Sequence, residues 1–137
     1  MKPILVDTGC IVALLDRSER HHLSCVQTVT ELAAPLVTCD AVIAESCYLL
    51  RSLKGAPEAV LQNVERRVFR LPFRLDASAD AVRRLLHRYR NVPMDLADGC
   101  LVQMADELVT GDILTLDSDF EIYRWRRGRK FRNLLGS

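Results

Sequence analysis

The chain has 137 residues, and its 19 basic and 18 acidic side chains leave a net charge of only +1 at pH 7. This balance excludes a uniformly basic nucleic-acid binder, and no apolar run approaches the roughly 18 residues that suggest a membrane span. The five cysteines are odd in number and lack CxxC spacing, which argues against a disulfide framework or a zinc site. We expect one domain over residues 1–137, without a signal peptide, in the reducing cytoplasm.

Short apolar runs alternate with helical patterns along the whole chain. Strands are predicted at residues 3–6, 36–38, 68–71 and 113–116, with weaker strands near 121–123 and 131–134. Helices are predicted at residues 9–16, 18–34, 40–53, 57–67, 76–91 and 95–108, with Ser18, Asp40, Asp76 or Ser78, and Asp95 as N-caps. Apolar strands that alternate with helices indicate a parallel sheet covered on both faces.

Four acidic residues stand in apolar surroundings, where carboxylates are rarely buried unless they are paired or bound to metal. They are Asp7, Glu45, Asp98 and Asp117. Asp7 and Asp117 each follow a predicted strand, at the edge where open parallel sheets bind ligands. Glu45 and Asp98 fall on the apolar faces of their predicted helices. If the fold brings the four together, a divalent cation is their natural partner, and the chain is a candidate metal-dependent nuclease.

Each acid also has an ordinary structural explanation. Asp7 could be the N-cap of a helix, and Glu45 could form an ion pair with a buried arginine. Asp98 could interact favourably with the positive end of a helix dipole, and Asp117 could be a turn residue. Under these explanations, four acids would face the protein interior for four unrelated reasons. A single shared metal site explains all four positions and is the simpler hypothesis. Asp95 and Asp119 fit better as capping or turn residues, although a supporting role beside the four acids is compatible with both.

A basic segment near the C-terminus stands out against the neutral average. Six of the cations fall within residues 124–132, together with Trp125 and Phe131. Such a segment can contact the phosphates and bases of a nucleic acid. A solvated tail or a surface for an acidic protein partner explains it equally well. The residues predicted to contact substrate are Arg124, Arg126, Arg127, Arg129 and Lys130.

Four strings in order along the chain resemble the PIN-domain ribonucleases, and among them the VapC-like toxins of bacterial toxin–antitoxin modules. They are ILVDTG at residues 4–9, TCDAVIAE at residues 38–45, PMDLAD at residues 93–98 and ILTLDSDF at residues 113–120. The resemblance spans nearly the whole chain. One departure is Gly99, where such proteins often carry alanine after the third acid.

The resemblance implies a three-layer α/β/α sandwich with a parallel sheet of about five strands. It identifies Asp7, Glu45, Asp98 and Asp117 as the metal-binding and catalytic quartet, supported by Thr8, Asp95, Thr115 and Asp119. It further implies Mg²⁺ or Mn²⁺ as cofactor, RNA as substrate, a small antitoxin protein as partner and a homodimer. Oxygen-only ligands suit these cations better than zinc.

The expected reaction is hydrolysis of RNA phosphodiester bonds, which leaves a 5′-phosphate and a 3′-hydroxyl. Two other functions remain open at this point. An acid-pocket phosphatase or phosphoacceptor domain would use Asp7 as a nucleophile, although Lys2, Lys54 and Lys130 are poorly placed to assist it. A catalytically silent RNA-binding module would have the same fold, but such a protein would not need four intact acids.

Overall fold

The computed structural model describes residues 1–136, and one parallel sheet organises them. The sheet has the order β3-β2-β1-β4-β7, and each neighbouring pair of strands is parallel. Its strands are β1 (Ile4–Val6), β2 (Leu36–Val37), β3 (Phe69–Arg70), β4 (Asp112–Leu114) and β7 (Arg132–Asn133). The central strand β1 is buried along its whole length, as its uninterrupted apolar sequence predicts.

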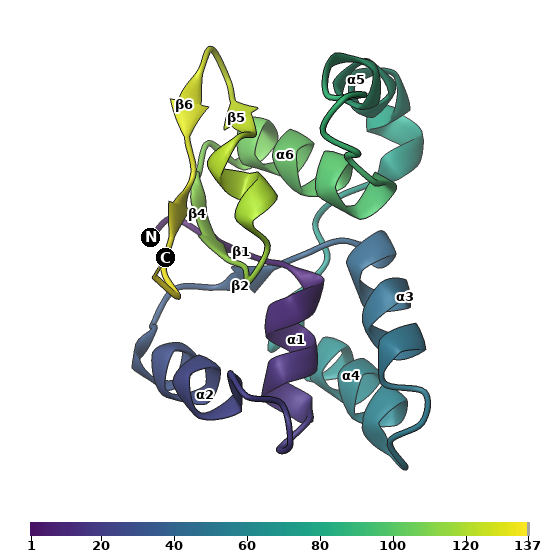
Figure 1. The fold of residues 1–137 in the computed structure, drawn as a ribbon, viewed down its shortest axis with the longest axis vertical. Coiled ribbons are helices and arrows are strands. Elements are labelled where there is room, and N and C mark those ends of the chain that lie inside the picture. The colour runs from purple at the N-terminus through teal and green to yellow at the C-terminus, as the bar shows by residue number, and fades with distance from the viewer. Residues whose placement is uncertain (137) are drawn as a thin grey trace.

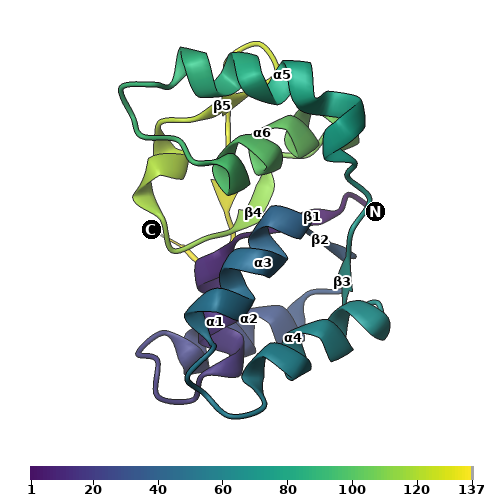
Figure 2. The same cartoon turned by 90° about the vertical axis from the view of Figure 1, so that its right-hand side faces the viewer.

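Helices cover both faces of this sheet. They are α1 (Thr8–Leu15), α2 (His22–Glu31), α3 (Asp40–Leu49), α4 (Ala56–Glu65), α5 (Leu75–Arg88) and α6 (Leu96–Leu108). Helices α5 and α6 lie on one side, α1, α2 and α4 lie on the other, and α3 packs beside α1, α4 and α6 (Figures 1 and 2). The predicted α/β/α sandwich with a five-stranded parallel sheet is confirmed. No helix within residues 1–136 is long and apolar enough to cross a membrane.

Several predicted helix boundaries were wrong by a few residues. The second helix begins at His22 because the Asp16 carboxylate accepts hydrogen bonds from the backbone N–H and hydroxyl of Ser18, which holds Ser18 in a turn. Helix α3 ends at Leu49 instead of residue 53, and Cys39, not Asp40, is its N-cap. Helix α5 has Arg74 as its N-cap. Asp95 caps α6 as predicted.

The segment after β4 departs furthest from the prediction. A short 3₁₀ helix, η1 (Ser118–Glu121), occupies part of the weak strand expected at residues 121–123. An antiparallel hairpin follows, formed by β5 (Arg124–Trp125) and β6 (Arg129–Lys130). Its turn has positive φ angles at Arg126 and Gly128, a geometry that glycine adopts without strain. The hairpin projects beyond the sheet at the top of Figure 1.

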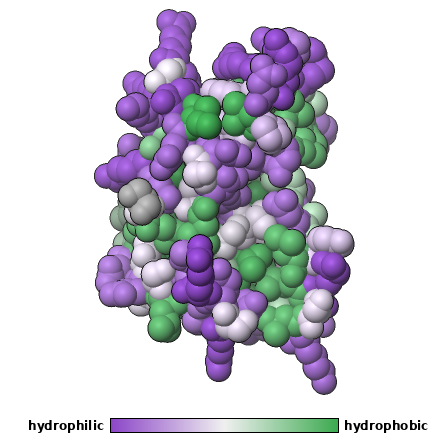
Figure 3. Space-filling model, in the orientation of Figure 1, coloured by the Kyte–Doolittle hydropathy of each residue, from purple (hydrophilic) through white to green (hydrophobic). Residues whose placement is uncertain are grey.

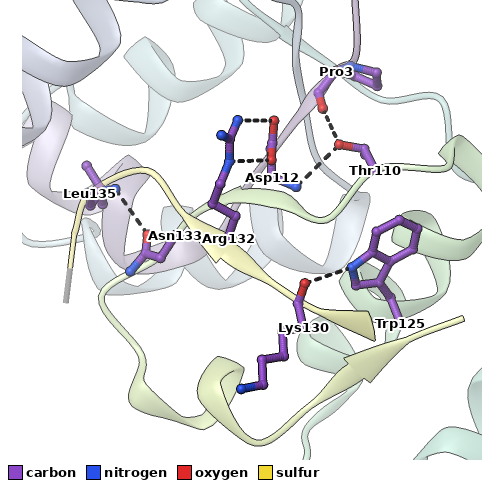
Figure 4. A network of polar contacts seen from close by, with 8 residues as sticks. All are labelled: Pro3, Thr110, Asp112, Trp125, Lys130, Arg132, Asn133 and Leu135. Carbon is purple, nitrogen blue, oxygen red and sulfur yellow. Dashed lines mark hydrogen bonds and ion pairs between the residues drawn. The ribbon is translucent and has the colours of Figure 1, made fainter. Parts of the chain in front are cut away.

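Polar contacts fasten the C-terminal segment to the sheet (Figure 4). The Arg132 guanidinium donates two hydrogen bonds of 3.0 Å to the Asp112 carboxylate. The Trp125 indole N–H donates to the Lys130 carbonyl at 3.1 Å, while its ring packs on Gly111. Because the backbone N–H of Arg132 also donates to the Gly111 carbonyl, strand β7 and the hairpin share one anchor at Gly111, directly before β4.

A methyl group at position 111 should therefore loosen this anchor. A Cβ atom on Gly111 would lie 2.1 Å from the Trp125 indole nitrogen, so that the ring must move. We expect Gly111→Ala to lower the free energy of unfolding by about 1–3 kcal/mol, the usual cost of overpacking. The control is Gly9→Ala, whose new Cβ would meet Leu116 at an ordinary 3.4 Å. Equal denaturation midpoints for the two variants would contradict the expected clash.

Candidate active site

Asp7 lies at the carboxyl end of the central strand, where the backbone turns from β1 into α1. It is the N-cap of α1, and its Oδ1 accepts a 2.7 Å hydrogen bond from the backbone N–H of Thr8. Its Oδ2 accepts a 2.8 Å hydrogen bond from the Thr115 hydroxyl. The side chain is only 5% exposed. Asp7 thus acts as a helix cap and also presents a carboxylate at the sheet edge that was predicted to hold a site.

Asp98 enters the same region from the first turn of α6. The Asp95 carboxylate caps this helix by accepting the backbone N–H of Asp98 at 2.8 Å. The Asp98 side chain is 7% exposed, and its Oδ2 accepts a 3.0 Å hydrogen bond from the Tyr123 hydroxyl. Asp95 itself is exposed and points its carboxylate at the helix backbone. Helix α6 therefore carries one buried acid and one capping acid.

Asp117 follows β4, and Thr115 connects it to Asp7. The Thr115 hydroxyl donates to Asp7 and accepts a 3.0 Å hydrogen bond from the backbone N–H of Asp117. Asp117 in turn accepts the backbone N–H of Asp119 at 2.9 Å. One carboxylate oxygen from each of Asp7, Asp98 and Asp117 lies within 4.8 Å of the other two. We call these three residues the acidic cluster, of which Asp117 is the most exposed member.

Glu45 lies next to the acidic cluster and is only partly buried on α3. The Thr8 hydroxyl donates a 2.6 Å hydrogen bond to its Oε1, while the backbone N–H of the same threonine donates to Asp7. Thr8 therefore connects the fourth predicted acid to the first. The charge of Glu45 also contributes to raising the pKa of Asp7. No buried arginine neutralises Glu45, since Thr8 is its hydrogen-bond partner among residues 1–136.

The buried acids hold their protons unusually tightly. Burial, with smaller contributions from the charges of Asp117 and Glu45, raises the pKa of Asp7 to about 6 against the lowering effect of its hydrogen bonds. Burial, with the charges of Asp95 and Asp7, raises the pKa of Asp98 to about 7. The ion pairs between the described residues all lie elsewhere on the surface. Residues 1–136 thus supply no paired cation that would neutralise the acidic cluster.

A divalent cation fits this arrangement. Three convergent carboxylates offer only oxygen ligands, the donor type that hard cations prefer, and their mutual repulsion is relieved when a cation binds. Hydrogen bonds from Thr8, Thr115 and Tyr123 orient the carboxylates, as outer groups commonly do at metal sites. The residues present could therefore hold a metal ion with its ligands already aligned.

Sequence reasoning missed two residues that support the acidic cluster. Tyr123 is fully buried, packs edge-on against Tyr89 and Phe120, and donates its hydroxyl to Asp98. Asn133 brackets the main chain of Thr115: its Oδ1 accepts from the Thr115 N–H at 3.2 Å, and its Nδ2 donates to the Thr115 carbonyl at 2.9 Å. Neither carries a sequence signal, because a tyrosine and an asparagine in a C-terminal segment are common surface residues.

Removal of the Asn133 amide should disturb the acidic cluster through Thr115. Asn133→Leu keeps a side chain of similar volume and deletes the two hydrogen bonds to Thr115, together with those to the Leu135 N–H and the Gly136 carbonyl. We expect the affinity for Mn²⁺, measured by calorimetric titration, to fall about 10-fold, as is usual when an outer support of a metal ligand is lost. Asn91→Leu, at an exposed position, is the control. An unchanged affinity in a folded Asn133→Leu protein would contradict this role.

Three of the basic residues predicted to contact substrate, Arg124, Arg126 and Arg129, form their contacts with groups other than the carboxylates of the acidic cluster. The Arg126 backbone N–H and guanidinium both contact Asp106, which is about 12 Å further along α6 from Asp98. The Arg124 guanidinium donates to the carbonyls of residues 121–123. The Arg129 guanidinium lies over the Trp125 ring, 5.2 Å from its centre. The hairpin arginines thus lie around the far end of α6, and their substrate role stays a prediction.

The fold and the carboxylate arrangement agree with a known class of domain. Residues 4–125 match the family model of the PIN domain. The chain therefore belongs to this family. Among relatives, "Ribonuclease VapC26" of Mycobacterium tuberculosis (strain ATCC 25618 / H37Rv) is 29% identical over 116 residues, which are 83% of this chain and 86% of that protein. The crystal structure of Mycobacterium tuberculosis VapC20, described as a sarcin-ricin loop cleaving toxin, has the same fold. It gives a TM-score of 0.78 at 19% identity, covering 87% of this chain and 93% of that one.

Proposed function

We propose that this protein, acting as a single domain, is a metal-dependent endoribonuclease and the toxin of a toxin–antitoxin pair. The observation that carries the proposal is the gathering of Asp7, Asp98 and Asp117 at one edge of the sheet in a PIN domain. The name of the relative, a ribonuclease, and the description of the structural neighbour, a sarcin-ricin loop cleaving toxin, support RNA as the substrate. We expect the protein to act in the cytoplasm, where its RNA substrates are found.

The chain's own residues would divide the work as their contacts suggest. Asp7, Asp98 and Asp117 would hold Mg²⁺ or Mn²⁺, with Glu45 as a fourth carboxylate beside them. A bound cation would supply stabilisation of the charge that develops at the scissile phosphate and would make the attacking water more acidic. Thr115 keeps Asp7 and Asp117 at a fixed separation, and Tyr123 keeps Asp98 directed toward both. The reaction requires no 2′-hydroxyl group from the substrate.

A groove at the far end of α6 is our candidate for binding the RNA backbone. It has a volume of about 810 Å³ and lies between α5, α6 and the β5–β6 hairpin. Its cationic lining consists of Arg88, Arg124, Arg126, Arg127 and Arg129. Hydrophilic side chains dominate this upper part of the molecule (Figure 3). Gln103 and Asp106 line the groove about 8 Å and about 12 Å along α6 from Asp98, so a phosphate held there would lie near the acidic cluster without contacting it.

Loss of a groove arginine should weaken RNA binding in a salt-dependent way. Arg127 is exposed, so that replacing it removes a charge without removing core contacts. We expect Arg127→Gln to lower affinity for every RNA tested and to reduce the slope of log K against log salt by about one unit. Arg66→Gln, exposed at the C-cap of α4 and outside the lining of the groove, is the charge-matched control. The same salt slope for both variants and wild type would rule out a phosphate contact at Arg127.

The test of the proposed function is the chemistry of the product ends. Purified protein is incubated with structured and single-stranded RNA in Mg²⁺, Mn²⁺ or EDTA. We expect internal cuts that EDTA abolishes and that leave 5′-phosphate and 3′-hydroxyl ends. Products with 2′,3′-cyclic phosphates would overturn the hydrolytic mechanism, because the 2′-hydroxyl would then be the nucleophile. RNA binding without cleavage would favour a binding module, and phosphate trapped covalently on Asp7 would favour a phosphotransfer enzyme.

Protein partners are the remaining part of the proposal. Exposed apolar side chains gather near the end of α3, where Tyr48 is 62% exposed, Leu49 54% and Leu53 41%. Contiguous exposed apolar side chains are a common feature of protein contact surfaces. We propose that surfaces of this kind serve a homodimer and a small antitoxin protein that inserts near the acidic cluster.

A further inference from the structure

A second cavity adjoins the acidic cluster on the side of Asp117. Its volume is about 730 Å³, within the range of pockets that enclose small organic ligands. Three separate segments form its wall: the turn between α1 and α2, the 3₁₀ helix η1, and the C-terminal segment from Phe131 onward. Thr115 and Asp117 also line it, so that the cavity is continuous with the candidate active site. A group bound there would lie beside Asp117, at the edge of the acidic cluster.

The turn between α1 and α2 gives this cavity a basic wall. Arg20 is exposed, and its Nε donates a 3.1 Å hydrogen bond to the Nε2 of His21. No carboxylate of residues 1–136 forms an ion pair with Arg20, so the terminal nitrogens of its guanidinium are available. A guanidinium with two free nitrogens matches the oxygens of a phosphate. This wall therefore suits the anionic part of a nucleotide.

The opposite part of the lining is acidic and aromatic. Asp117 and Glu121 contribute carboxylates, which repel a phosphate and direct it toward Arg20. Phe131 is half-buried, and Phe120 fixes its ring by an edge-on contact with centroids 5.4 Å apart and planes at 89°. A ring held in this way can accept a stacked base at little cost in conformational entropy. The amide of Asn133 is already engaged with Thr115 and is not free to bind a ligand.

We propose that this cavity binds one RNA nucleotide next to the scissile phosphate, with its base stacked on Phe131 and its phosphate at Arg20. The proposal deepens the proposed function, because it assigns a substrate subsite to the same site. Phe131 lies beyond residue 125, where the match to the PIN family model ends. The C-terminal segment would then contribute one wall of a substrate subsite as well as a strand of the sheet.

An abasic-site scan tests the stacking directly. Binding of fluorescein-labelled single-stranded RNA 10-mers is measured in EDTA, and one abasic nucleotide is moved along the strand. For the wild-type protein we expect one position at which loss of the base weakens binding about 10-fold, since base stacking on an aromatic ring contributes about 1–3 kcal/mol. For Phe131→Leu we expect weaker binding of intact RNA and no sensitive position. Phe131→Tyr should restore both properties, because its ring can still stack.

Substitution of Arg20 should give a different signature. We expect Arg20→Gln to weaken intact and abasic RNA by the same factor and to lower the salt slope by about one unit. Arg17→Gln, from the same turn but outside the cavity lining, is the control. An abasic scan that is flat for wild type, or Phe131→Leu binding that equals wild type, would overturn the subsite. Because these assays contain EDTA, a failure to cleave RNA would not affect them, and a sensitive position without cleavage would separate the two proposals.

Discussion

Asp98→Asn is expected to make the metal-free protein more stable while it abolishes the response to metal. The substitution keeps the shape of the side chain and the acceptor for the Tyr123 hydroxyl, but it removes a buried charge next to Asp7 and Asp117. We expect the Tm in EDTA at pH 7.5 to rise by at least about 3 °C, the shift that roughly 1 kcal/mol produces in a domain of this size. Thermal denaturation followed by dye fluorescence measures both effects.

The wild-type protein should be less stable than Asp98→Asn in EDTA and should be stabilised by metal. Millimolar Mn²⁺ should raise its Tm, because a ligand that binds only the folded state stabilises it. Asp76→Asn is the control, since this carboxylate pairs with Arg74 on the exposed surface and contributes little. The control should match wild type in EDTA and in Mn²⁺. A fall in Tm for Asp98→Asn in EDTA, or an unchanged rise in Mn²⁺, would contradict a cation-binding role for Asp98.

The second large effect is a dependence of metal binding on pH. The folded pKa values of about 6 for Asp7 and about 7 for Asp98 lie above the ordinary value of 3.8. Between pH 4 and 7 the folded state therefore binds protons that the unfolded state has released, so these groups make the metal-free protein less stable as pH rises. Metal binding requires the deprotonated carboxylates and should show the reverse trend.

We expect the Tm shift caused by Mg²⁺ or Mn²⁺ to be large at pH 7.5 and nearly absent at pH 5. Over the same range, the Tm in EDTA should decline as pH rises, and this decline should be smaller in Asp98→Asn. The measurement is a series of thermal denaturation curves at half-unit pH intervals with and without metal. A metal-induced shift of equal size at pH 5 and pH 7.5 would mean that the cation binds away from the buried acids.

The sequence predicted the part of the fold that depends on local periodicity. Apolar strands alternating with helices gave the parallel sheet, and the position of Asp7 and Asp117 after strands placed both at its carboxyl edge. Asp95 was predictable as a cap because the residue type and its position before an apolar helix agree. The inward orientation of the Asp98 side chain was predictable from helical spacing, because its neighbours at i+3 and i+4 are the apolar Leu101 and Val102.

Features that depend on tertiary contacts could not be predicted. The roles of Tyr123 and Asn133 arise because residues distant in sequence, Asp98 and Thr115, lie beside them in the fold. The β5–β6 hairpin depends on a backbone turn at Arg126 and Gly128 and on the packing of Trp125 against Gly111. The position of the basic segment around the far end of α6 also depends on the hairpin, and its predicted role in substrate binding stays a prediction.

Cleavage of RNA by wild type and Asp98→Asn, purified in parallel, tests the central claim most directly. Each protein is stripped with EDTA, supplied with excess Mn²⁺ and followed by the initial rate of cutting of one labelled RNA. We predict that wild type regains its rate and that Asp98→Asn stays at least about 100-fold slower, a typical loss when electrostatic stabilisation of the transition state is removed. Equal rates in the two preparations, or cutting that continues in EDTA, would contradict a metal-dependent nuclease built on the acidic cluster.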